Sequence, residues 1–349
     1  MRISRPFTVL LAWALLLTLG AAAFAQEPIL HDVRPGYGVT GIGWLSDYHA
    51  PLRGTPVDTR VYYMDSGQPG PTVVIVGGTH SNEIAGISAA LLIVERAEVT
   101  KGRLIVIPYA NSSGASITDT IRTQIGSWSV ETISGIRTFP YGDRRTSLEH
   151  QGPDPEVFFH YPTGYELDPS EARNLNRNHP GKPDGTLTQQ LAYAYTQLIK
   201  AENADIAVDM HEAGVKSRLA NMLIANPKNM DLAVLAVVEL EYQGIKMNLE
   251  HSSEEFRGLS HREWGDHTQA AAYLIETPNP GQSPETYSDE EVDVVNDPTY
   301  PLAKRVATQI ATIEAIFSAH EMVYGERLEW KNLPSYAELV ANGLGAYLR

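Results

Sequence analysis

A histidine and a glutamate three residues apart, His80 and Glu83, stand in the segment Gly77–Gly86, directly after an apolar run. An imidazole and a carboxylate at this spacing can bind one metal ion. The pair alone is a weak signal, because a polar loop in front of a helix has the same composition. Two further residues that can handle metal ions and protons, His211 and Glu276, each follow another apolar run.

Together these four residues suit a hydrolytic zinc centre. Zinc held by two histidines and one glutamate keeps one position open, and water bound there becomes acidic near neutral pH. The glutamate that does not bind the metal can take the proton of that water and hand it to a leaving amine. The chain has no cysteine, which excludes thiolate ligands and disulfides. We therefore expect one zinc ion, held by histidine and carboxylate ligands.

A second polar motif, Asn176-Arg177, lies in the segment Asn174–Gly181. A side-chain amide next to a guanidinium fork is suited to binding a carboxylate. The arginine alone would be unremarkable on a surface loop. In combination with a zinc centre, the pair predicts a substrate with a free carboxylate.

The elements that would position these residues alternate between strand and helix. Short β-branched runs predict buried strands, and longer amphipathic segments predict helices. The expected strands are 59–64, 73–76, 104–107, 206–210, 219–225 and 271–275, and the expected helices are 84–97, 186–201, 231–242 and 301–322. This order is typical of one α/β domain with a mixed, largely parallel twisted sheet flanked by helices. In a parallel sheet the carboxyl ends of the strands meet at one edge, where ligands bind.

The long segment 111–183 shows little periodicity, and we expect it to form loops over the active site. The polar stretch 257–263, which contains His261, is expected to be a solvated loop; contact with substrate is the alternative.

The N-terminus has the pattern of a signal peptide. Arg2 and Arg5 precede an apolar stretch from Thr8 to Ala22, and Ala23-Phe24-Ala25 fits a cleavage site. We therefore expect residues 1–25 to be removed, an irregular segment with one strand over 26–70, and a catalytic domain over 71–349. The protein would be exported to the periplasm or secreted, without a membrane segment after cleavage.

Composition excludes some partners. The chain has 27 basic and 42 acidic residues, a formal charge of −15. Such an excess of acid argues against nucleic acid and against an anionic membrane surface. There is no Gly-x-Ser-x-Gly motif, which disfavours a serine hydrolase of that type.

Four motifs in this order resemble the zinc carboxypeptidase superfamily, which also includes succinylglutamate desuccinylase and aspartoacylase deacylases. They are His80-Ser81-Asn82-Glu83, Leu175-Asn176-Arg177-Asn178, Asp209-Met210-His211 and Ile275-Glu276-Thr277. The resemblance implies a carboxypeptidase-like fold. It also implies that zinc is bound by His80, Glu83 and His211, that Glu276 is the general acid and base, and that Asn176 and Arg177 hold the terminal carboxylate of the substrate.

The resemblance further implies an arginine that stabilises the oxyanion. The candidates are Arg144 and Arg145, of which we prefer Arg145 as the catalytic one and expect Arg144 to contact substrate. The chain departs from the family at Asn174, where an aspartate often orients a zinc-bound histidine. Asp209, two residues before His211, is the expected substitute in this supporting role. The tyrosine that covers the substrate in the family has no single counterpart, and Tyr273 and the Tyr-rich N-terminal segment are the candidates.

These observations predict an exported zinc-dependent amide hydrolase. A metallocarboxypeptidase acting on peptides is preferred, because of export and the long gap between His80 and His211. An N-acyl amino acid deacylase is the alternative, favoured by the motif Gly77-Gly78-Thr79-His80. A non-catalytic binding protein on the same fold is the second alternative.

Overall fold

The computed structural model describes residues 27–118, 125–253, 256–282 and 292–349. Its centre is an eight-stranded sheet with the spatial order β1-β2-β5-β3-β10-β13-β11-β12. The strands are β1 (Gly41–Trp44), β2 (Arg60–Asp65), β3 (Thr72–Gly77), β5 (Arg103–Ile107), β10 (Ile206–Gly214), β11 (Met222–Ala225), β12 (Asn248–His251) and β13 (Ala271–Asn279).

The four central strands, β5, β3, β10 and β13, run parallel, whereas β2 and β11 pair antiparallel with their outer members. The sheet is therefore mixed, with a parallel centre, as predicted. The chain leaves β3 toward β5 on one side and later places β10 on the other side. The carboxyl edge between β3 and β10 is thus a topological switch point, the place where open α/β sheets bind ligands.

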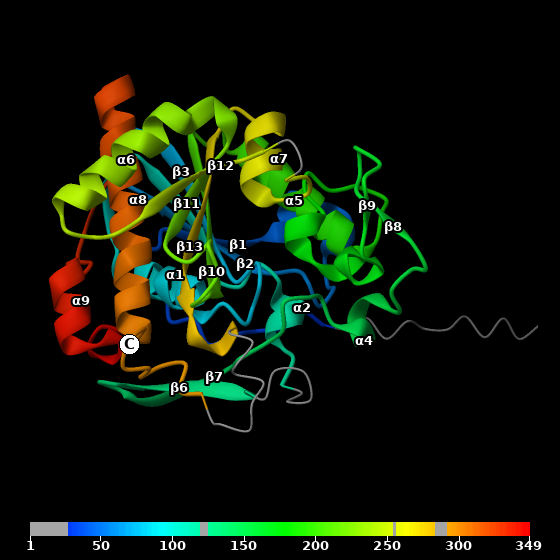
Figure 1. Cartoon of the computed structure of the whole chain (residues 1–349), viewed down its shortest axis with the longest axis horizontal. Coiled ribbons are helices and arrows are strands. Elements are labelled where there is room, and N and C mark those ends of the chain that lie inside the picture. Colours follow the sequence, from blue (N-terminus) through cyan, green and yellow to red (C-terminus); the bar gives the residue numbers. More distant parts are fainter. Residues whose placement is uncertain (1–26, 119–124, 254–255, 283–291) are drawn as a thin grey trace, which may run out of the picture.

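Helices cover both faces of the sheet (Figure 1). One face packs against four helices and the other against two. The first group is α1 (Ile84–Arg96), α6 (Met230–Tyr242), α8 (Leu302–Tyr324) and α9 (Tyr336–Asn342), and the second is α5 (Leu187–Ala201) and α7 (Ser260–His267). We call these the α1–α8 face and the α5–α7 face.

Local sequence explains where the helices begin and end. Thr186 and Gln189 form a capping box at the start of α5, which satisfies two backbone N–H groups. Gly325 ends α8 in the left-handed conformation that glycine adopts without strain. The predicted helices and most predicted strands thus lie within a few residues of the observed ones.

Two expectations about local structure are wrong. The segment expected to be a solvated loop enters α7, and its His261 is completely buried. The strands β10 and β13 also extend three residues beyond His211 and Glu276, so these residues lie inside strands and not at their ends. The elements α7, β10 and β13 all carry charged or polar residues that are buried. Sequence periodicity does not predict the burial of such residues.

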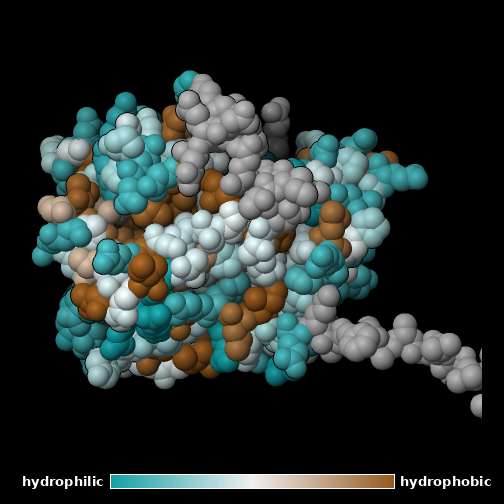
Figure 2. Space-filling view, turned by 90° about the horizontal axis from the view of Figure 1, so that it is seen from below, coloured by the Kyte–Doolittle hydropathy of each residue, from teal (hydrophilic) through white to brown (hydrophobic). Residues whose placement is uncertain are grey.

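The segment 111–183 is mostly irregular but contains short elements. They are α2 (Ser112–Ala115), the hairpin of β6 (Ser127–Thr132) and β7 (Gly135–Pro140), α4 (Leu148–Gln151), β8 (Phe158–Phe159) and β9 (Glu166–Leu167). A further pair, β4 (Glu98–Lys101) and β14 (Glu329–Lys331), lies outside the main sheet. Seen from below, apolar residues are scattered among hydrophilic ones over the visible described surface (Figure 2).

The signal sequence predicted over residues 1–25 lies outside the described residues. Among the helices that the structure describes, none has the length and apolar character needed to cross a bilayer.

Candidate metal centre

His80, Glu83 and His211 come together at this switch point between β3 and β10, and all three are buried. Glu83 lies between the two rings: its Oε1 is 2.7 Å from Nδ1 of His80, and its Oε2 is 2.8 Å from Nδ1 of His211. The two Nδ1 atoms are 3.2 Å apart. In the described part of the chain, this is the group of histidine and acidic residues whose ligand atoms could close on one metal ion.

Two glycines allow this approach. A Cβ at Gly77 would lie 2.5 Å from the carbonyl oxygen of Gly86, and a Cβ at Gly86 would lie 2.5 Å from that of Met210. Helix α1 therefore packs directly on the ends of β3 and β10. This close packing brings Glu83, the residue before α1, to His211 from the neighbouring strand.

Each imidazole uses its other nitrogen to contact an oxygen. Asn174 Oδ1 can only accept, so Nε2 of His80 donates to it, at 2.9 Å. Nε2 of His211 lies 2.8 Å from Asp209 Oδ2. A proton on each Nε2 leaves each Nδ1 with a lone pair directed at the common centre, the arrangement that metal-binding histidines need.

The charges around this centre favour a cation. Burial alone would lower the pKa of His211, but the carboxylates of Asp209 and Glu83 raise it well above its usual value. Burial would likewise raise the pKa of Glu83, but His80 and His211 hold it well below its usual value. These carboxylates therefore favour a positive charge between the three side chains, and a divalent cation suits the donor set.

Glu276 stands directly beside His211, because the two residues are register partners on the parallel strands β13 and β10. Its Oε2 is enclosed and has no hydrogen-bond partner among the described residues. Burial, together with the carboxylate of Glu83, raises the pKa of Glu276 to about 8. A carboxyl group with this pKa exchanges protons near neutral pH.

The two candidate arginines point in different directions. Nη1 of Arg144 lies 3.5 Å from Glu83 Oε1, and about a third of its side chain is exposed. Arg145 turns away from the metal cluster: its Nε donates to the carbonyl of Ser170 and its Nη2 to Glu171. The structure thus brings Arg144, and not the preferred Arg145, to the three ligand candidates.

Asn176 and Arg177 lie on a short 3-10 turn close to the cluster. Asn176 Oδ1 accepts from the backbone N–H of Ser260, so its Nδ2 is the group that can meet a ligand. Arg177 is largely enclosed, and burial followed by the nearby charge of Arg144 lowers its pKa. Tyr273, one candidate for a covering tyrosine, is instead buried in the core of the α1–α8 face.

Sequence reasoning missed three residues that contact this site. Gln282 Nε2 donates to Glu83 Oε1 at 3.1 Å, and the backbone N–H of Glu212 donates to Glu83 Oε2 at 3.0 Å. Glu171 accepts from Asn174 and Arg145. Only Glu171 had a signal in the sequence, since it is an acid one short turn before the unusual Asn174.

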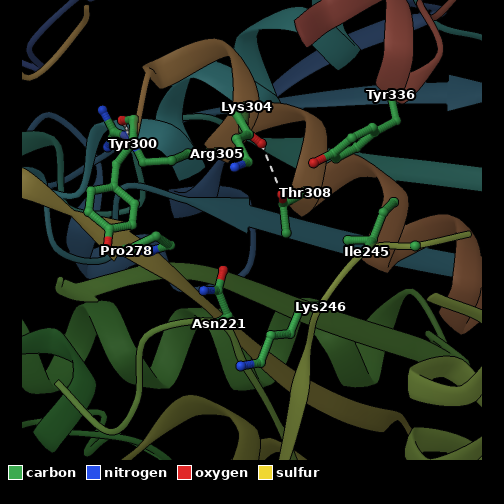
Figure 3. Close-up of a pocket in the computed structure, with 10 residues that line it drawn as sticks. Asn221, Ile245, Lys246, Pro278, Tyr300, Lys304, Arg305, Thr308 and Tyr336 are labelled. Carbon is green, nitrogen blue, oxygen red and sulfur yellow. Dashed lines mark hydrogen bonds between the residues drawn. The ribbon is translucent and has the colours of Figure 1, made fainter. Parts of the chain in front are cut away.

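A hollow of about 360 Å³ lies on the α1–α8 face of the sheet, and none of the predicted site residues lines it (Figure 3). Asn221 and Lys246 stand opposite Lys304 and Thr308 of α8. Arg305 at one end of this hollow is buried and pairs with Glu212. The hollow is therefore separated from the metal cluster by the sheet itself.

The chain matches none of the known protein-family models. It is 26% identical over 147 residues to the N-alpha-acetyl-L-2,4-diaminobutyric acid deacetylase of Halomonas elongata, a match that covers 42% of this chain and 29% of that protein. The chain thus aligns with less than a third of the length of this curated relative.

The solved structures that the chain matches include a succinylglutamate desuccinylase from a Silicibacter species, with a TM-score of 0.45 and 16% identity. The alignment covers 80% of this chain and 64% of that one. A metallo-carboxypeptidase from Burkholderia cenocepacia has a TM-score of 0.48 and 11% identity over 81% of this chain and 65% of that one.

Proposed function

We propose that this protein is a zinc-dependent hydrolase of an amide bond, acting on a substrate with a free carboxylate. The observation that carries the proposal is the convergence of two imidazole nitrogens and a carboxylate beside Glu276. Such a constellation combines a metal site with a group that can move a proton.

His80, Glu83 and His211 would hold the ion. When bound, zinc would supply a Lewis acid for the scissile carbonyl and would lower the pKa of water. The donor set fits: both Nδ1 atoms face Glu83, and Asn174 and Asp209 hold the opposite edges of the rings. Two histidines and one carboxylate are a ligand set found at catalytic zinc sites.

Glu276 would accept a proton from the attacking water and pass it to the leaving nitrogen. Its position beside His211 and its lack of a fixed partner suit this exchange. Arg144, which lies next to Glu83 and is partly exposed, would stabilise the negative charge that develops on the carbonyl oxygen. Arg145, paired with Glu171, would not take part directly.

Arg177 and Asn176 would bind the carboxylate of the substrate. Nη1 of Arg177 donates to the carbonyl of Asn176, which holds the guanidinium close to its own backbone. The amide Nδ2 of Asn176 and the remaining guanidinium edge can then donate to a carboxylate together.

Two substrate classes fit this anchor. An N-acyl amino acid is supported by the match to a deacetylase. A peptide with a free C-terminus is supported by the predicted export and by the motif spacing. Both place a carboxylate near Arg177 and an amide near Glu276.

The test is to purify residues 26–349, measure bound zinc, and assay release of amino acids from peptides and from N-acyl amino acids. We expect about one zinc per chain and turnover of one class that chelation abolishes. Arg144→Gln should lower kcat by about 100-fold, as the loss of one oxyanion donor does, whereas Arg145→Gln should have a smaller effect. Zinc-free protein that hydrolyses neither class would contradict the proposal.

We also propose export. The support is the basic, apolar and small-residue order of residues 1–25. Mass spectrometry of the protein expressed with its full N-terminus should find Gln26 as the first residue of the mature chain. An intact N-terminus would contradict export with cleavage.

A further inference from the structure

The two candidate histidine ligands are supported unequally. His211 faces a carboxylate directly, since Asp209 Oδ2 is 2.8 Å from its Nε2. His80 faces the neutral amide of Asn174. The difference is not one of burial, because Asn174 and Asp209 are both completely buried.

On the Nε2 side of His80, the carboxylate of Glu171 is reached through Asn174 and does not contact the imidazole directly. Asn174 Nδ2 donates to Glu171 Oε2 at 2.5 Å, while Asn174 Oδ1 accepts from His80 and from the backbone of Asn176. His80, Asn174 and Glu171 therefore form one chain of hydrogen bonds. The negative charge that Asp209 supplies directly to His211 is supplied here through an amide.

Glu171 also fixes which way the amide of Asn174 faces. An amide with an acceptor at Nδ2 and two donors at Oδ1 has one favourable orientation. In that orientation Nε2 of His80 keeps its proton and Nδ1 offers its lone pair to the metal cluster. If the amide turned over, its N–H groups would face Nε2 of His80 and favour the opposite tautomer.

The carboxylate of Glu171 also lies close to two arginines, Arg145 and Arg177. Its Oε1 accepts from Arg145 Nη2 at 3.2 Å, and its Oε2 lies 4.0 Å from Nε of Arg177. The Glu171 side chain is only 19% exposed, so these charges interact in a partly desolvated space. Glu171 thus pairs with Arg145 and places its charge beside Nε of Arg177, whose Nη1 donates to the carbonyl of Asn176.

We propose that Glu171 is a positioning residue that joins the metal centre to the carboxylate anchor. Through Asn174 it sets the tautomer and orientation of His80, and through Arg177 it orients the group that binds the substrate. This inference rests on the proposed function and adds a residue to it that touches neither metal nor substrate.

The test exchanges the carboxylate of Glu171 and the amide of Asn174. Glu171→Gln removes the charge, Asn174→Asp places a second carboxylate against Glu171, and the double variant restores one amide and one carboxylate in reversed positions. Zinc affinity of the metal-free proteins is measured by competition with a chromophoric chelator, and kcat and KM are measured separately. Glu166→Gln, the same change at an exposed position on β9, is the matched control.

We expect each single variant to bind zinc roughly 10- to 100-fold more weakly, the usual effect of removing a partner of a metal-binding histidine. The double variant should recover most of that affinity. Its KM should stay raised, as in Glu171→Gln, because Arg177 has lost its partner in both. The control should match the wild type in affinity and KM.

Wild-type zinc affinity in Glu171→Gln, or a double variant no tighter than the weaker single variant, would overturn the inference and leave the proposed function intact. A wild-type protein that binds no zinc would overturn both. If Glu171→Gln does not fold, the double variant against Asn174→Asp gives the same comparison: recovery supports the coupling and no recovery refutes it. Loss of unfolding free energy without loss of zinc affinity would show a merely structural role.

Discussion

His211 and Glu212 are neighbours on β10, equally buried, yet they serve opposite faces of the sheet. His211 points to the α5–α7 face and meets Glu83, Asp209 and Glu276. Glu212 points to the α1–α8 face, where its carboxylate accepts from Arg305, the backbone of Ala85 and Asn279. Adjacent strand residues point to opposite sides, so one strand serves a chemical site and a structural one.

The carboxylates on the two faces, Glu276 and Glu212, differ in whether each of their oxygens has a hydrogen-bond donor. Both oxygens of Glu212 have fixed donors, one of them the buried guanidinium of Arg305. Glu276 keeps an enclosed oxygen without a partner among the described residues. A carboxylate with every donor fixed stabilises the fold, whereas one with a free oxygen can exchange a proton. Burial by itself therefore does not distinguish a catalytic acid from a structural one.

The largest expected effect is on the α5–α7 face. Glu276→Gln should lower kcat by roughly 100- to 10,000-fold, because an amide of the same shape cannot accept the proton. Zinc content and the free energy of unfolding should stay near the wild-type values, since the Oε2 of Glu276 makes no described hydrogen bond. Steady-state kinetics with metal analysis measure both. A variant with full turnover would show that Glu276 is not the proton acceptor.

The matching change on the α1–α8 face should act on stability. Glu212→Gln leaves Arg305 buried without its counter-charge, and breaking a buried pair in this way costs about 3–5 kcal/mol. Urea unfolding should show this loss, while the fraction that remains folded keeps a kcat close to that of the wild type. Loss of turnover at unchanged stability would break the distinction between the two faces.

The smallest expected effect is the response of the α5–α7 face to acid. Burial lowers the pKa of both His179 and His261 to about 3, so both are neutral in the folded protein. In the unfolded chain they take up protons below about pH 6.5. Stability should therefore fall as the pH drops from 6.5 toward 3, by about 1 kcal/mol for each histidine over the first pH unit and by about 1.4 kcal/mol per unit below that.

Unfolding by urea at pH 7 and pH 5.5, in the wild type and in His261→Gln, isolates one of these contributions. The variant should lose less stability between the two pH values, because one proton-binding group of the unfolded chain has gone. An unchanged pH dependence would mean that His261 is protonated to the same extent in both states.

Sequence periodicity predicted most of the central strands and four of the helices that cover the sheet. Short apolar runs predicted β3, β5, β10 and β13, and helical spacing predicted α1, α5, α6 and α8. These patterns reflect burial against a sheet or along one helix face, and burial depends mainly on the local sequence. The positions of His80, Glu83, His211 and Glu276 after predicted parallel strands further predicted that they meet at one edge of the sheet.

Tertiary structure decided what the neighbouring side chains do. Arg144 and Arg145 are identical in type and adjacent, but Arg145 pairs with Glu171 and Ser170 whereas Arg144 lies beside Glu83 in the cluster. The same acid explains Asn174, whose amide looks like a defect in the sequence and is one link of a hydrogen-bonded chain in the fold. Such choices depend on contacts between loop residues whose backbone directions are set by distant segments, and no local pattern in the chain encodes them.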